Sequence, residues 1–115
     1  MPREIYLVSR DPLTLPVLLE ASAQVDGTLV PRLLNEGVAL QLVDLDDVAV
    51  ITLDNSRLLA ESGDVERITG PLPGSGELWW TEATAPWGRA GESGVRIARA
   101  IGELLGGRVQ VEEGL

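Results

Sequence analysis

Three aspartates lie close together, Asp44, Asp46 and Asp47, and they are the first residues of the chain whose type and spacing suggest a chemical function. Clustered carboxylates can bind a divalent cation, act as nucleophiles or attract a basic partner. An EF-hand calcium loop starting at Asp44 is excluded, because Ala49 occupies the glycine position of that loop and Asn55 the position of its bidentate glutamate. Three interpretations stay open: electrostatic selection of a basic partner, weak adventitious binding of a divalent metal, and a solvated turn that limits aggregation at the end of a hairpin.

The same run, Val43-Asp-Leu-Asp-Asp-Val48, resembles over six residues the D-x-D-x-V nucleophile motif of haloacid-dehalogenase-type phosphatases. The resemblance implies an aspartate nucleophile, a parallel sheet and a lysine later in the chain. This chain contains no lysine, and we therefore assign no catalytic residue here.

Three tryptophans, Trp79, Trp80 and Trp87, lie within nine positions, and Tyr6 is the one further aromatic residue of the chain. Neighbouring residues of a strand point to opposite faces, so Trp79 and Trp80 cannot share one core. Leu78 and Trp80 form the more apolar pair, which places Trp80 inward and Trp79 on the face away from the helices. Exposed tryptophans are common anchors of protein interfaces. Trp79, Trp87 and Tyr6 are thus candidate partner-binding residues, and the alternative is that Trp79 packs beneath a loop.

The composition excludes several classes of chemistry. The chain has 115 residues, no cysteine, no histidine and a net charge of −9. It therefore lacks disulfides, imidazole acid–base catalysis, the usual zinc ligands and a lysine for a Schiff base or phosphate loop. Residues 36–66 carry eight acids against Arg57 alone, which disfavours nucleic acid as a partner. We expect no cofactor and no metal, and the use of arginine in place of lysine indicates a GC-rich, bacterial genome.

The periodicity of the apolar residues predicts the elements that carry these groups. The pairing of 38–43 with 48–53 through an acidic turn is the clearest feature, because two β-branched runs flank a short polar connection. Residues 57–69 are compatible with a strand or a helix, and 70–76 are glycine- and proline-rich, as in a loop. The predicted elements are a strand over 4–9, a helix over 14–25 capped by Thr14, a helical turn over 30–36, strands over 38–43, 48–53 and 77–83, a helix over 93–105 and a strand over 108–111.

This order predicts a single α+β domain over residues 1–115, built as a two-layer sandwich. A mainly antiparallel sheet of four or five strands carries two main helices on one face, and a ferredoxin-like arrangement is one candidate. If Ile5, Leu7, Leu78 and Trp80 face the helices, the other face of the sheet is apolar as well. That face contains Tyr6, Val8, Ala39, Gln41, Val43 and Trp79.

An apolar sheet face of this kind requires a cover, and a two-fold related copy is the commonest one. We therefore expect a small acidic, non-enzymatic module that binds a protein partner or itself, with a homodimer formed through the open sheet face. Accessory and immunity proteins have this physical profile. We expect a cytoplasmic protein, no membrane span and no nucleic acid. The alternative is a small enzyme or ligand-binding protein that uses carboxylates.

Overall fold

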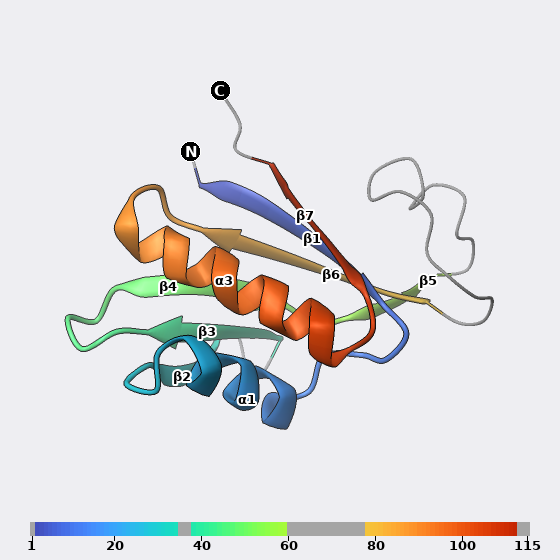
Figure 1. Ribbon diagram of the computed structural model, residues 1–115, viewed down its shortest axis with the longest axis horizontal. Coiled ribbons are helices and arrows are strands. Elements are labelled where there is room, and N and C mark those ends of the chain that lie inside the picture. Colours follow the sequence, from blue (N-terminus) through green and yellow to red (C-terminus); the bar gives the residue numbers. More distant parts are fainter. Residues whose placement is uncertain (1, 35–37, 60–77, 113–115) are drawn as a thin grey trace.

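The computed structural model describes residues 2–34, 38–59 and 78–112. Helices α1 (Leu15–Val25) and α3 (Arg89–Leu104) lie on one face of a seven-stranded antiparallel sheet (Figure 1). The strand order is β2-β3-β4-β6-β1-β7, and β5 also pairs with β6. The expected α+β class, the antiparallel sheet and the two helices are confirmed, while the sheet has more strands than expected. The strands are β1 (Arg3–Ser9), β2 (Val30–Leu34), β3 (Ala39–Val43), β4 (Ala49–Asp54), β5 (Arg57–Leu59), β6 (Leu78–Ala85) and β7 (Arg108–Glu112).

Strands β4 and β5 follow the same edge of β6, one after the other. Leu53 is opposite Ala83, whereas Arg57 is opposite Trp80, so the register shifts by one residue between the two strands. The Ser56 hydroxyl lies at this shift, where it accepts a hydrogen bond from the Leu13 amide at 2.9 Å and pairs with the Thr81 hydroxyl at 2.6 Å. The predicted break after β4 is therefore present, and the chain then resumes as a strand. The predictions for residues 60–77, including the glycine-rich loop, lie outside the described residues.

Helix α1 begins where its sequence predicts. The Thr14 side chain accepts a hydrogen bond from the Val17 amide, and Pro16 lies in the first turn. Asp26 ends the helix in an extended conformation, with its amide bonded to the Ser22 carbonyl at 2.7 Å.

Helix α3 approaches the sheet closely through glycines. A Cβ atom at Gly94 would overlap the carbonyl oxygen of Val50 and lie 3.1 Å from the Ala85 Cβ. The helix begins at Arg89, one turn before the predicted start. Gly106, at φ 62°, follows its end as expected and leads into β7.

The predicted helical turn over 30–36 is wrong, because residues 30–34 form the edge strand β2. Val30 pairs with Val43 and Leu34 with Ala39, so β3 supplies the hydrogen-bonding partner of this strand. The residues next to β2 in the sequence do not predict this pairing. Pro31 is compatible with this position, since an edge strand needs fewer backbone donors.

The two tryptophans of β6 face the opposite way from the prediction. Val8 is opposite Trp80 and Tyr6 opposite Glu82, on the face turned away from the helices, hereafter the open face. Trp79 shares the other side with Thr81 and is half-buried. The physical reason is the close approach of α3: beneath the helix this side of β6 contains only the small residues Thr81, Ala83 and Ala85, while Trp79 lies on the same side at the beginning of the strand.

Candidate functional site on the open sheet face

An aromatic pair lies at the centre of the open face. The rings of Tyr6 and Trp80 stack with their centroids 5.3 Å apart and an interplanar angle of 28°. Val8 is fully buried beside them, Trp80 is 8% exposed, and Leu78 packs against the same group. This small apolar cluster is separate from the main core beneath the helices.

A shallow recess of about 160 Å³ opens next to Tyr6. Strands β1, β4 and β6 bring its walls together, because Glu4 is opposite Thr84 and Thr84 is opposite Thr52. The Tyr6 hydroxyl donates a hydrogen bond to Glu4 Oε2 at 3.0 Å. The lining residues are Glu4, Tyr6, Thr52, Asp54, Glu82, Ala83 and Thr84.

The electrostatic potential of this recess is negative. The hydrogen bond to Glu4, partial burial and the charges of Glu4, Glu112 and Glu82 together raise the pKa of Tyr6 above its usual value. Glu82 is already 3.6 Å from the Arg57 guanidinium, although both side chains are largely exposed. Such an exposed pair contributes little energy and leaves much of the negative field in place.

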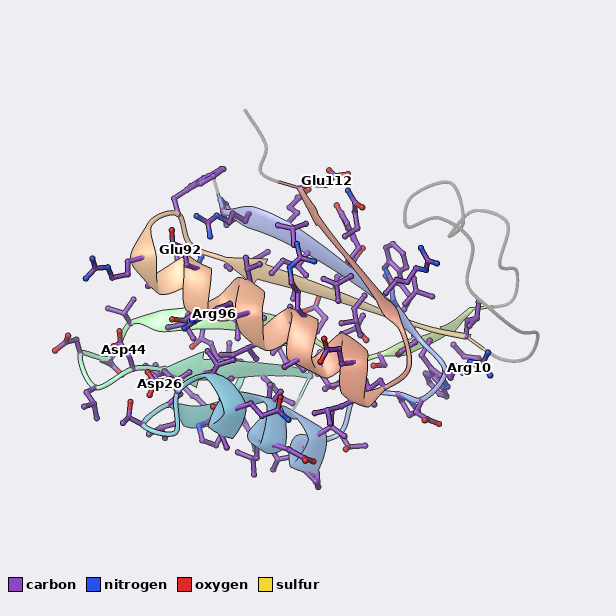
Figure 2. All side chains as sticks on the ribbon, in the orientation of Figure 1. Arg10, Asp26, Asp44, Glu92, Arg96 and Glu112 are labelled. Atoms are coloured by element: carbon purple, nitrogen blue, oxygen red, sulfur yellow. The ribbon has the colours of Figure 1, made fainter. Side chains whose placement is uncertain are left out.

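Glu4 and Glu112 form a like-charged pair directly across the ladder between β1 and β7. Like charges at opposed cross-strand positions destabilise a sheet. Within residues 2–34, 38–59 and 78–112, no ion pair to either glutamate is found. Glu112 lies near the end of β7 (Figure 2), across β1 from the recess and outside its lining.

The predicted acidic group over 44–47 lies elsewhere, in the turn between β3 and β4 (Figure 2). Asp44 Oδ1 accepts hydrogen bonds from the amides of Asp46 and Val48, both at 2.9 Å. Asp47 adopts a positive φ of 63° and pairs with Arg32. Asp44 and Asp47 therefore organise the turn, and only Asp46 points its charge into solvent without such a contact among the described residues. This local role and the antiparallel sheet both differ from what the phosphatase resemblance implies.

Trp87 lies between β6 and α3, and it is 44% exposed. The Arg3 guanidinium stacks over its ring at 5.2 Å from the centroid. Of the residues predicted to bind a partner, the structure places Tyr6 in the recess, while Trp79, Trp87 and the aspartates of the turn lie outside its lining. Sequence reasoning missed Trp80, Glu4 and Glu82, although the alternation of Glu4 with Tyr6 already puts both on one face.

Comparison of the chain with models of protein families, with curated proteins and with solved structures gives no match. No helix in the described part of the chain is long and apolar enough to cross a membrane. In the same part of the chain, no three acidic side chains converge as ligands for a metal ion.

Proposed function

We propose that this protein is a binding module that docks a basic protein segment on the open face of its sheet. The recess beside Tyr6 would take an arginine or lysine side chain of that partner. The observation that carries the proposal is the like-charged pair Glu4–Glu112, of which Glu4 lines the recess next to an aromatic stack. A partner's cation would reduce any repulsion between these two acids and gain attraction from Glu4 and Glu82, which line the recess.

The aromatic pair supports the same partner chemistry. The Tyr6 ring, stacked on the nearly buried Trp80, offers a rigid apolar platform within the acidic rim. Guanidinium groups stack on aromatic faces while their edges bond to carboxylates. Arginine is therefore favoured over lysine.

The electrostatics favour a basic partner over a second copy at this face. Each copy carries a net charge of −9, and a two-fold contact through the open face would bring two acidic recesses together. A homodimer was expected at this face because the sequence predicted an apolar surface. The face instead has polar and charged residues beside its aromatic centre, namely Glu4, Glu82, Thr84, Arg108 and Glu112.

The enzyme alternative gains no support from the recess. Acid–base catalysis with carboxylates favours a site that excludes water and perturbs their pKa values. Glu4 and Asp54 are exposed, and the recess is shallow. In the proposed role, the exposed Asp46 of the turn adds long-range attraction, and Trp79 and Trp87 are candidate secondary contacts.

We also propose that the fold is a ferredoxin-like arrangement extended by one hairpin. When β2 and β3 are set aside and β4 is counted with β5, the remaining elements follow the order β-α-β-β-α-β along the chain. Strand β1 lies between β6 and β7, as in a split β-α-β unit. The acidic turn between β3 and β4 lies outside the lining of the recess on the proposed docking face.

The docking proposal can be tested with a synthetic extended peptide that carries arginine at alternate positions, so that the arginines share one side of the chain. We expect amide chemical shifts to change on β1, β6 and β7 when this peptide is titrated into the labelled protein. In the double variant Glu4→Gln/Glu112→Gln, the Kd should rise about fivefold, because two charge contacts are removed. The matched control is Glu20→Gln/Glu103→Gln, which removes two exposed acids from the helices.

The outcome separates specific docking from general attraction to an acidic protein. Specific docking predicts an unchanged Kd for the control variant and a weaker Kd at high salt. Equal losses in both variants, or shift changes confined to the helix layer, would overturn the proposal. A peptide with glutamate at the alternate positions should not bind.

A further inference from the structure

Helix α1 and the edge strand β2 carry several exposed apolar side chains, none of which lines the recess. Among the described residues, four of the ten exposed large apolar side chains belong to α1 and β2, namely Leu15, Leu19, Val30 and Leu33. Leu15 and Leu19 are one helical turn apart on α1, and each is 42% exposed. Leu33 of β2 is 65% exposed. Helix α1 and strand β2 both lie at the bottom of the view in Figure 1.

Strand β2 is the edge of the sheet, and most helix contacts fall on other elements. Helix α3 packs on β4, β6, β1 and β7, while α1 packs chiefly against α3. Leu33 is opposite Leu40 and thus points to the helix side, and Val30 points to the open face. Both sides of this edge strand therefore expose apolar residues. We call Leu15, Leu19, Val30 and Leu33 the α1–β2 margin.

We propose that a second copy of this chain packs on the α1–β2 margin. Residues 15–34 contain only three of the chain's 27 charged residues, namely Glu20, Asp26 and Arg32. A two-fold contact places each group near its own copy, so like charges in the contact repel. A chain with a net charge of −9 can therefore self-associate best where its surface is apolar and nearly free of charge.

The same charge argument disfavours other occupants of the margin. A basic partner finds its complement at the recess, because the margin offers it two acids beside one arginine. Pro31 lacks a backbone donor, and edge strands that carry proline and charge resist extension of the sheet. The contact is therefore assigned to the leucine and valine side chains. It is independent of the proposed docking function and leaves the recess accessible, because none of its four residues lines the recess.

The test is sedimentation velocity of the full chain at low and at high salt, over a range of micromolar concentrations. Added salt screens the repulsion between two acidic copies, so the dimer should become tighter with salt. This is the opposite of the salt effect expected for a basic peptide at the recess. The two proposals can thus fail separately.

Variants locate the contact. Leu33→Asp should raise the dimer Kd by about tenfold or more, because symmetry places the new carboxylate in the contact twice. Leu104→Asp, which changes an exposed leucine of α3, is the matched control and should leave the Kd unchanged. Circular dichroism and thermal unfolding check that both variants fold. A monomer at both salt concentrations, a dimer that dissociates with added salt, or equal losses in both variants would overturn the proposal.

Discussion

Replacing Gly94 with alanine tests the close approach of α3 to the sheet. In most helix interiors this change is stabilising, because alanine has the higher helix propensity by about 1 kcal/mol. At Gly94, however, the new Cβ would overlap the main-chain oxygen of Val50 and lie 3.1 Å from the Ala85 Cβ. Two opposing effects therefore act at a single methyl group.

The steric effect is the larger one. Overpacking a core costs about 1–3 kcal/mol, and the upper end applies where the obstacle cannot rotate away. Here the obstacle is a carbonyl of β4, which is held between β3 and β6. A cost of about 3 kcal/mol less a gain of about 1 kcal/mol leaves a net destabilisation of about 2 kcal/mol. For a domain of this size, that loss corresponds to a decrease in Tm of roughly 8 °C.

Thermal and urea unfolding followed by circular dichroism measure this loss. Gly27→Ala is the matched control, because a Cβ there would have nothing within 4 Å, and its free energy of unfolding should change by less than about 0.5 kcal/mol. If Gly94→Ala were as stable as the wild type, the helix would not lie against the β4 backbone as described. The explanation given for the small residues on the helix side of β6 would then be wrong as well.

Two further predictions concern the recess and the hairpin turn. Tyr6 is the only tyrosine, so absorbance in an alkaline titration reports on it alone. The pKa of Tyr6 should be above the usual value in the wild type and should fall in Glu4→Gln. A Tyr6 pKa that is the same in both proteins would refute the hydrogen bond to Glu4. Because folding raises this pKa, the contribution to stability is complete below the usual tyrosine pKa and should be lost as pH rises through the folded-state pKa. In the turn, Asp44→Ala should lower the free energy of unfolding by about 1 kcal/mol, because two backbone amides lose their acceptor. Asp46→Ala, which removes an equal charge but no such acceptor, should leave that free energy unchanged, and equal effects would show that charge alone matters.

The elements that the sequence predicts well are those specified by neighbouring residues. The Thr14 cap, the acidic turn after Val43 and the glycines after Leu105 act within a few residues, and each marks a boundary in the structure. The hairpin of β3 and β4 could be predicted for the same reason. Strand β2 could not, because its conformation depends on pairing with β3 and its own residues are compatible with a turn.

The site was predicted less well than the fold, for a reason that can be traced to α3. Assigning Trp80 to the core assumed that the more apolar pair of the strand, Leu78 and Trp80, faces the helices. The glycines of α3 reverse this rule, because a helix in van der Waals contact with a sheet needs small residues opposite it. The spacing of Gly91 and Gly94 together with Thr81, Ala83 and Ala85 is the signal that would have placed Trp80 on the open face.

The acidic residues of the open face have two possible explanations, namely binding of a partner and solubility of an aromatic surface. The packing of α3 bears on the choice between them. Once the indole of Trp80 is displaced from the helix side, acidic neighbours keep that face hydrated, and any exposed position would serve that purpose. Glu4 and Glu112, however, occupy directly opposed positions, where their repulsion costs up to about 1 kcal/mol. Gln110 lies on β7, like Glu112, but is opposite Tyr6. An acidic side chain at position 110 would therefore not face another carboxylate across the ladder. Solubility alone does not account for two directly opposed acids beside the recess, whereas the docking of a partner's cation, as proposed above, would.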